Sequence, residues 1–308
     1  MPNIGSLQLK NNLVCAPLAG ISDYSFRQLA RDFGIGLSYT EMISAIGVYK
    51  NSSKCRSFSF ISGEHPVSTQ IFGKDPISMA YAAKFFEDKG ADVIDINFGC
   101  PVKKVVKQGA GAILMKDITL CQHIIKAVRK AISIPLTIKI RLGWSAAEEN
   151  YLQLARIAQL EGVDAICLHP RYATQLFSGS ADWSKFIDLR KITTLKLIGS
   201  GDIKTSSEIT AHNVKYPVDF IMLGRGLMGN PWLISDCLKL TSISLQDTLR
   251  KHYGYLLNLF PEKKASNLFR KFVGKYTKNL SNAKELRSIG NSISCANDFS
   301  KLLEAINV

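Results

Sequence analysis

The sequence predicts a (β/α)8 barrel followed by a small, all-helical C-terminal domain. Eight short apolar runs suit strands that are buried on both faces of a parallel sheet, and amphipathic segments lie between them. The pattern changes after Trp232, where strand-like runs stop. We therefore assign the barrel to residues 1–240 and the helical domain to residues 241–308. A doubly wound sheet does not need eight such regular units, and no GxGxxG follows the first strand.

Each predicted strand is rich in apolar or β-branched residues, and the eight runs are 12–17, 37–42, 67–73, 92–98, 136–142, 165–170, 195–200 and 220–224. Amphipathic patterns predict helices at 23–33, 77–90, 120–132 and 148–162. Two of these helices end in Gly90 and Gly162, a common stop signal. Residues 245–308 have apolar positions at helical spacing, which predicts three or four helices. Beyond the strand–helix alternation, the sequence has no internal repeat.

Several classes of protein are excluded by the sequence. No apolar run approaches the roughly 18 residues of a membrane span. The N-terminal MPNIGSLQLKNN lacks the basic and apolar regions of a secretory signal, so we expect a cytoplasmic protein. We also expect a monomer. Seven cysteines without a CxxC pair argue against a disulfide framework and against a zinc or iron–sulfur site, so no metal is expected.

The charge of the chain indicates a polyanionic partner. The formal net charge is +14, and such an excess is typical of proteins that bind nucleic acid. From Thr241 onward there are eleven Lys and Arg against five Asp and Glu, a net charge of +6 over 68 residues. This tail is more than twice as basic per residue as the rest, and we expect cations such as Lys271 to face the polyanion.

Candidate functional residues gather where the predicted strands finish, because the βα loops of a barrel open on one face. They are Ala16, Pro17 and Leu18 (first strand), Gln70 (third), Asn97 and Cys100 (fourth), Lys139 and Arg141 (fifth), His169 and Arg171 (sixth), Ser200, Gly201 and Asp202 (seventh), and Gly224 and Arg225 (eighth).

The turns after the seventh and eighth strands predict a phosphate site. Each is rich in glycine and leads toward a helix start, so backbone N–H groups and helix N-termini can face an anion. Arg225 would add a charge-assisted contact. The phosphate could belong to a substrate or to a cofactor.

Two further side chains are unusual in their positions. Lys139 lies inside an apolar strand, so it needs a nearby anion or an electron-rich ring, or acts as a Schiff base. Cys100 lies in a Gly-Cys-Pro turn and can serve as a nucleophile or as a proton donor. Lys103 and Lys104 could lower its pKa if they face the thiol, or could belong to a solvated face.

With these residues in place, the chain resembles the tRNA-dihydrouridine synthases, flavin barrels that reduce uridine in tRNA, and its spacing is most similar to the bacterial B-type branch. The matching segments occur in the family's order across 16–232, and a helical tail fits the family's tRNA-binding domain. They are APLAGISDYSFR, QIFG, DINFGCPVKKVVKQGAGAILM, TIKIRLGW, LHPR, GSGDI and MLGRGLMGNPW.

The resemblance implies that FMN is the cofactor and that NADPH, or NADH, is the reductant. Ala16, Pro17 and Leu18 would line the flavin, and Gln70 and Lys139 would contact its ring. The turns at Ser200, Gly201 and Asp202 and at Gly224 and Arg225 would hold the phosphate and ribityl chain. His169 would approach the flavin or the target base. The family usually has Asn at position 200 and Met at position 18.

The resemblance also implies that hydride from the reduced flavin reaches C6 of uracil while Cys100 gives a proton to C5. Asn97, Arg141 and Arg171 are the expected substrate contacts, and the target uridine must be extruded from the folded tRNA. Three other interpretations stay open: an FMN barrel acting on a small molecule, such as a dihydroorotate-type dehydrogenase, a Schiff-base lyase that uses Lys139, and a non-catalytic RNA-binding protein.

Overall fold

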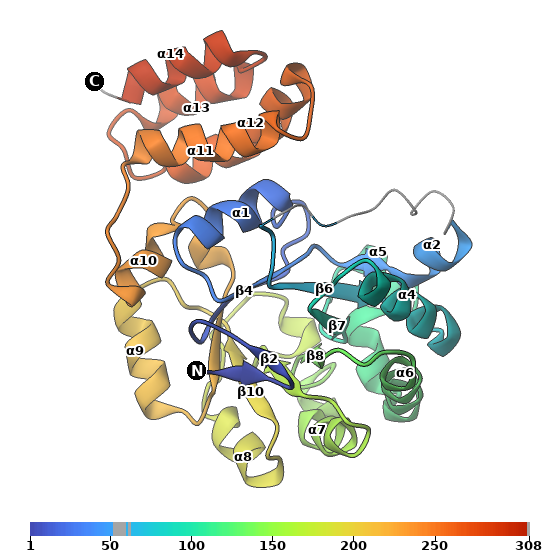
Figure 1. Ribbon diagram of the computed structural model, residues 1–308. Coiled ribbons are helices and arrows are strands. Elements are labelled where there is room, and N and C mark those ends of the chain that lie inside the picture. Colours follow the sequence, from blue (N-terminus) through green and yellow to red (C-terminus); the bar gives the residue numbers. More distant parts are fainter. Residues whose placement is uncertain (52–59, 61–62, 307–308) are drawn as a thin grey trace.

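A closed barrel of parallel strands lies at the centre of the molecule (Figure 1). The computed structural model describes residues 1–51, 60 and 63–306, and within these ranges eight strands form the ring. In ring order they are β3 (Leu13–Cys15), β4 (Leu37–Tyr39), β6 (Val67–Phe72), β7 (Val93–Asn97), β8 (Leu136–Ile140), β9 (Ala165–Leu168), β10 (Lys196–Ser200) and β11 (Phe220–Leu223). The pairings β11–β3 and β4–β6 close it. The predicted barrel class is confirmed.

Three further short strands of the described ranges lie outside the ring. β5 (Ile43–Ser44) pairs with the end of β6. β1 (Asn3–Ile4) and β2 (Leu7–Gln8) form an antiparallel hairpin. Ile4 and Leu9 of this N-terminal segment are buried in the same cluster as barrel residues such as Val14 and Phe220, so the hairpin helps to fill the barrel interior.

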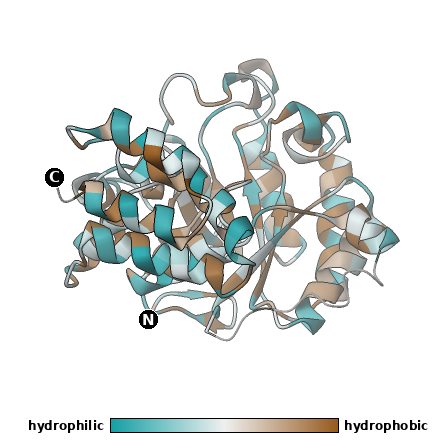
Figure 2. Ribbon diagram, turned by 90° about the horizontal axis from the view of Figure 1, so that it is seen from above, coloured by the Kyte–Doolittle hydropathy of each residue, from teal (hydrophilic) through white to brown (hydrophobic). Residues whose placement is uncertain are grey.

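Helices surround the barrel, and hydrophobic and hydrophilic residues alternate along them (Figure 2). Those that follow barrel strands are α1 (Tyr24–Asp32), α2 (Ala45–Lys50), α4 (Pro76–Asp88), α5 (Lys103–Val106), α6 (Ile118–Ala131), α7 (Tyr151–Leu160), α8 (Lys185–Ile192), α9 (Ser206–Lys215) and α10 (Trp232–Leu238). The predicted glycine stops are confirmed at α4 and α7, because Gly90 (φ +94°) and Gly162 (φ +77°) adopt the left-handed conformation just beyond the helices. α7 begins later than predicted, since residues 146–148 form a 3-10 turn.

The C-terminal region is helical, and its described residues form α11 (Leu245–Leu257), α12 (Glu262–Tyr276), α13 (Ala283–Ser292) and α14 (Ala296–Ile306). It packs on α1 of the barrel (Figure 1). Phe26 and Phe272 stack with ring centroids 6.3 Å apart. The buried His252 ring joins the Tyr276 hydroxyl at 2.8 Å and the Ser25 hydroxyl at 3.1 Å. The helical region is therefore fixed on the barrel by a buried interface.

Lys271 belongs to this interface. Its ammonium group lies 2.9 Å from the Asp23 carboxylate and donates to the Gly20 carbonyl at 2.7 Å. A charge reversal at Lys271 would disturb domain packing, so this residue is a poor test of the polyanion contact that the sequence suggests.

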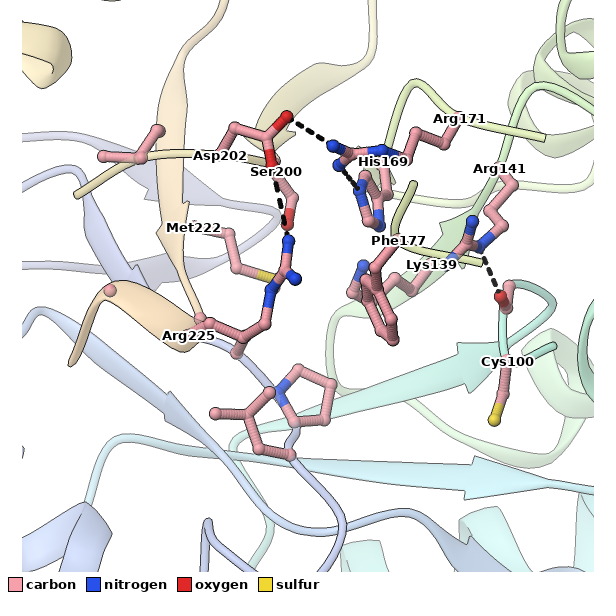
Figure 3. Close-up of a pocket in the computed structure, with 18 of the residues that line it drawn as sticks. Cys100, Lys139, Arg141, His169, Arg171, Phe177, Ser200, Asp202, Met222 and Arg225 are labelled. Atoms are coloured by element: carbon pink, nitrogen blue, oxygen red, sulfur yellow. Dashed lines mark hydrogen bonds and ion pairs between the residues drawn. The ribbon is translucent and has the colours of Figure 1, made fainter. Parts of the chain in front are cut away.

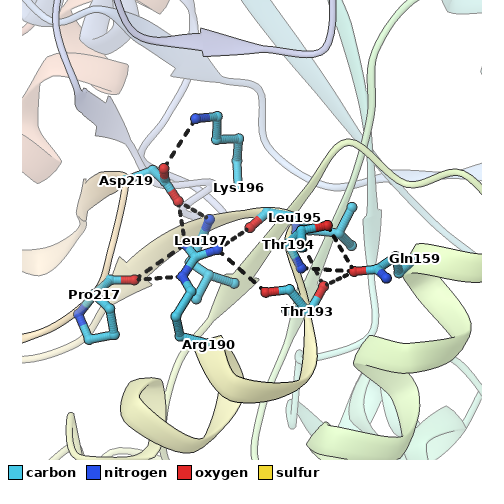
Figure 4. A network of polar contacts seen from close by, with 9 residues as sticks. All are labelled: Gln159, Arg190, Thr193, Thr194, Leu195, Lys196, Leu197, Pro217 and Asp219. Atoms are coloured by element: carbon cyan, nitrogen blue, oxygen red, sulfur yellow. Dashed lines mark hydrogen bonds and ion pairs between the residues drawn. The ribbon is translucent and has the colours of Figure 1, made fainter.

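The same pair of hydrogen bonds, made by an aspartate, joins neighbouring strands at three places at the N-terminal end of the barrel. The sequence analysis missed it. Asp219, just before β11, accepts the Leu197 N–H at 2.9 Å while its own N–H donates to the Leu197 carbonyl at 2.9 Å. Arg190 of α8 binds the same carboxylate at 2.6 Å and the carbonyls of the preceding loop (Figure 4). The same two-bond ring is formed by Asp164 with Leu136 and by Asp92 with Val67.

No helix of the described ranges is long and apolar enough to cross a membrane. The six described cysteines are free, and Cys55 lies outside the described residues. Within the same ranges, no three His, Cys, Asp or Glu side chains gather as a metal site would require.

Asp219→Ala is expected to lower the free energy of unfolding by about 1–3 kcal/mol, because the Leu197 N–H and the Arg190 guanidinium lose their acceptor. Urea titration followed by circular dichroism measures this loss. Asp188→Ala is the matched control, because Asp188 forms an exposed ion pair with Lys191 on α8. Equal stabilities of the two variants would contradict a structural role for the ring.

Candidate active site at the carboxyl end of the barrel

One cavity of about 980 Å³ opens at the carboxyl ends of the barrel strands (Figure 3). All fifteen residues that the sequence analysis singles out line it. Six cationic side chains also face it against two carboxylates, those of Asp202 and Glu208. The cavity therefore favours an anionic ligand.

The turns after β10 and β11 form the floor of one end of this cavity. Gly201 has a φ of +133°, and a Cβ there would lie 2.7 Å from the Cβ of Ala181. The Trp183 indole N–H donates to the Gly201 carbonyl at 3.1 Å, and this hydrogen bond holds the turn in place. Glycine is thus required at position 201 by both conformation and space.

The helix N-terminus beyond β10 differs from the prediction. α9 starts four residues after Asp202, and its capping box is closed by its own Glu208. The Glu208 carboxylate accepts the Lys204 N–H at 2.7 Å and the Thr205 N–H at 3.0 Å. These donors are already satisfied, so an anion would rely on the turns themselves and on Arg225 rather than on the start of α9.

Arg171 is almost fully buried and organises the wall beside these turns. Its guanidinium lies 2.6 Å from the Asp202 carboxylate and donates to the Gly179 carbonyl at 2.7 Å. It also donates to His169 Nε2 at 3.0 Å (Figure 3). Arg225 approaches the other Asp202 oxygen at 3.3 Å. These contacts favour a positioning role for Arg171 over the substrate contact that the sequence predicts.

The contact with Arg171 sets the protonation state of His169. A guanidinium can only donate, so Nε2 must be the acceptor and the ring proton resides on Nδ1. Burial lowers the pKa of His169 to about 2, helped by the neighbouring Lys139, Arg141, Arg171 and Arg225. His169 is therefore a neutral N–H donor at this site.

Lys139 and Arg141 follow one another on the same face at the end of β8. Arg141 Nε donates to the Gly99 carbonyl at 3.0 Å and its Nη1 to the Tyr172 carbonyl at 2.9 Å. Arg141 thereby joins the Cys100 turn to the loop after β9. Lys139 lines the cavity and makes no salt bridge with any carboxylate of the described residues. Its ammonium group is available to a ligand.

Cys100 and Asn97 are held together at the end of β7. The Asn97 side-chain oxygen accepts the Cys100 N–H at 2.9 Å and the Gly99 N–H at 3.1 Å. Its amide nitrogen donates to the Gln70 side-chain oxygen at 2.8 Å. The turn that carries the thiol is therefore fixed by the side chains of β6 and β7.

The environment of the Cys100 thiol differs from one sequence-based alternative. Burial raises the pKa of Cys100, and the cations that oppose this effect are Arg141 and Lys139. Lys103 and Lys104 are exposed on α5 and do not contribute. Of the two alternatives for these lysines, the structure therefore favours the solvated face, and the protonated thiol suits a proton donor.

Phe177 and Lys278 are among the lining residues that the sequence analysis missed. Phe177, in the loop after β9, is about half exposed, and its ring centroid lies 4.5 Å from the Arg225 guanidinium. No strand-end rule could have found it, since it lies eight residues beyond His169. Lys278 comes from the loop after α12, so the helical region contributes to the wall of the cavity.

His169 is expected to stay neutral between pH 8 and 5. The pKa of His169 in the folded state lies below the unfolded value of about 6.5. Above pH 6.5 the ring is neutral in both states, so His169 does not lower the free energy of unfolding there. Below that pH, His169 lowers the free energy of unfolding by up to ~1.4 kcal/mol per pH unit as the pH drops toward 2. Imidazole NMR signals, assigned with His169→Gln, should keep the Nδ1–H pattern in the folded protein. A titration midpoint between pH 5 and 8 would contradict the neutral ring, and an Nε2–H pattern would contradict the proposed tautomer.

Comparisons with known proteins find relatives along nearly the whole chain. The family model described as "Dihydrouridine synthase (Dus)" matches residues 14–308. The "Probable tRNA-dihydrouridine synthase" of Rickettsia bellii is 36% identical over 303 residues, 94% of this chain and 93% of the relative. The "tRNA-dihydrouridine synthase B" of Proteus vulgaris is 34% identical over 313 residues, 98% of this chain and 97% of the relative.

A solved structure of histamine dehydrogenase from Rhizobium sp. 4-9 is similar with a TM-score of 0.57 and 12% identity. The match covers 82% of this chain and 50% of that chain, so it bears on the fold alone. The family model and the relatives extend over nearly the whole chain, including the helical region. The chain belongs to the dihydrouridine synthase family.

Proposed function

We propose that this protein is a flavin-dependent tRNA-dihydrouridine synthase of the B type, which reduces the C5=C6 bond of particular uridines in tRNA. The observation that carries the proposal is that Cys100, Lys139 and the two strand-end turns share one cavity, in a chain that matches the family over 14–308. The names of the relatives support the choice of tRNA as the substrate.

The cavity fits FMN as the cofactor. Its volume is typical of a cofactor site. Its cations outnumber its carboxylates, as a phosphate requires. The residues proposed to hold the phosphate and ribityl chain are Ser200, Gly201, Asp202, Gly224 and Arg225; Gln70, Lys139 and His169 would contact the ring, and Ala16, Pro17 and Leu18 would line it. When bound, FMN supplies the hydride that uracil receives at C6.

The remaining chemistry belongs to side chains of the protein. Cys100 holds a proton at neutral pH, because burial raises its pKa, and we propose that this proton is given to C5. Asn97 can donate to a carbonyl oxygen of the base, and Arg141 keeps the Cys100 turn and the loop after β9 in place. His169 adds a neutral N–H donor.

A base inside a folded tRNA cannot reach the cavity, so the target uridine must leave its stack. We propose that the FMN-binding barrel spans residues 1–240 and that residues 241–308 bind tRNA through their cations. Lys278 supports this division, because it extends from the helical region to the cavity wall. We also propose NADPH as the reductant, a monomer as the active species and the cytoplasm as the location.

A dihydroorotate-type dehydrogenase is not favoured. It would act on a free small molecule and would have no need of a helical region with a net charge of +6. The family match gives a second argument against it.

The direct test is to incubate the purified protein with NADPH and dihydrouridine-free tRNA and to map the reduced positions. Cys100→Ala should retain FMN and its reduction by NADPH, yet reduce uridine about 10²–10⁴-fold more slowly, because the proton donor is lost. Mass spectrometry of digested tRNA measures the product, and NADPH oxidation without tRNA is the control. A fully active variant would remove Cys100 from the mechanism.

Lys278→Ala should raise the KM for tRNA and lower the slope of its salt dependence by roughly one, as for the loss of one phosphate contact. NADPH oxidation should stay unchanged. Lys301→Ala is the matched control, because Lys301 lies on α14 and faces Asp298 at 3.8 Å. An equal effect of both variants would mean that the helical region acts through its net charge only.

A further inference from the structure

A directional chain of hydrogen bonds runs from the interior of the barrel to the Cys100 turn. At its inner end lies Asp95 of β7, whose side chain is fully buried and does not line the cavity. Gln70 Nε2 donates to the Asp95 carboxylate at 2.6 Å, and the Thr137 hydroxyl donates to its other oxygen at 2.5 Å. At its outer end, Asn97 accepts the N–H groups of Gly99 and Cys100.

The two amides of this chain could each be turned by half a rotation, since their oxygen and nitrogen ends have the same shape. The ends of the chain remove this freedom. A carboxylate only accepts, so Gln70 must present its nitrogen to Asp95 and its oxygen to Asn97. Asn97 must then present its nitrogen to Gln70, which leaves its oxygen for the backbone N–H groups of the turn.

The ionisation of Asp95 is compatible with this role. Burial raises the pKa of Asp95 to about 6, against the hydrogen bonds from Thr137 and Gln70 and the charge of Lys139. The group is therefore mostly ionised, and a pure acceptor, at neutral pH. A buried carboxylate is expensive, and an apolar side chain of similar size is often as stable. Packing stability alone does not account for it.

We propose that Asp95 is a positioning residue that sets the direction of the Gln70 and Asn97 amides, so that the site offers N–H donors to carbonyl oxygens and holds the Cys100 turn. Gln70 has one further N–H after its contact with Asp95. Asn97 has one whose contact is the weak acceptor Met42 Sδ at 3.9 Å, and both amide residues line the cavity. The carbonyl groups of uracil and of a flavin ring accept from such donors, whereas the amino group of cytosine does not. The part of this inference that concerns uracil rests on the proposed function.

The decisive comparison is between Asp95→Leu and Asp95→Asn. Leucine removes the acceptor and frees both amides to turn. Asparagine can still accept from Gln70, because its own amide nitrogen can donate to the Thr137 hydroxyl oxygen. Asp95→Leu should therefore slow turnover with tRNA by about 10-fold to 100-fold, as expected for a misplaced catalytic group, and Asp95→Asn should restore most of it.

A second readout needs neither flavin nor tRNA. Alkylation of Cys100 by iodoacetamide in the apoprotein, quantified by peptide mass spectrometry against Cys237 in the same sample, reports on the turn. In Asp95→Leu the released turn should react about 3-fold faster or more, with Asp95→Asn at the wild-type rate. If the wild-type protein makes no dihydrouridine but alkylation follows this pattern, the positioning role stands while the proposed function fails.

Two results would overturn the inference. One is wild-type alkylation and turnover in folded Asp95→Leu; the other is an equal loss in Asp95→Leu and Asp95→Asn, which would make the charge the decisive property. Should Asp95→Leu fail to fold, Thr137→Val with and without Asp95→Asn replaces it. Thr137→Val keeps the Asp95 carboxylate, so Cys100 should be alkylated at the wild-type rate. In the double variant, nothing fixes which end of the residue 95 amide faces Gln70, so Cys100 should be alkylated faster.

Discussion

An uncompensated positive charge at the carboxyl end of the barrel is the constraint on which the site depends. Lys139, Arg141, Arg171 and Arg225 converge there, and Asp202 is the carboxylate that faces two of them. Burial keeps His169 neutral, and this charge adds to the effect. The charge also makes an anionic ligand the natural complement of the cavity. Cys100 nevertheless keeps its proton, because burial outweighs the attraction of the nearby cations for a thiolate.

The helical region contributes to the wall of the cavity as well as packing on the barrel. Lys271 and His252 fix it to α1, and Lys278 reaches the cavity from the end of α12. A backbone contact reinforces the arrangement, since a Cβ at Gly229, in the loop after β11, would lie 2.3 Å from the backbone of Lys275. The helical region and the loop after β11 are thus joined by direct packing.

The barrel and the gathering of the strand-end residues could be predicted from sequence, because strand periodicity and the geometry of parallel barrels determine which loops share a face. Contacts that depend on side-chain direction could not. The burial of Arg171, the capping of α9 by Glu208 and the tie between Lys271 and Asp23 all follow from tertiary packing. Phe177 carried no sequence signal, because its loop has no regular structure to place it.

The rings made by Asp92, Asp164 and Asp219 lie at the opposite end of the strands from the cavity. Polar contacts that hold neighbouring strands together are thus separated in space from the polar groups that remain free to react. Substitutions near the rings therefore act mainly on stability, whereas substitutions near Cys100 act on the chemistry of the site. A protein of this fold can therefore change its substrate without changing the contacts that stabilise the barrel.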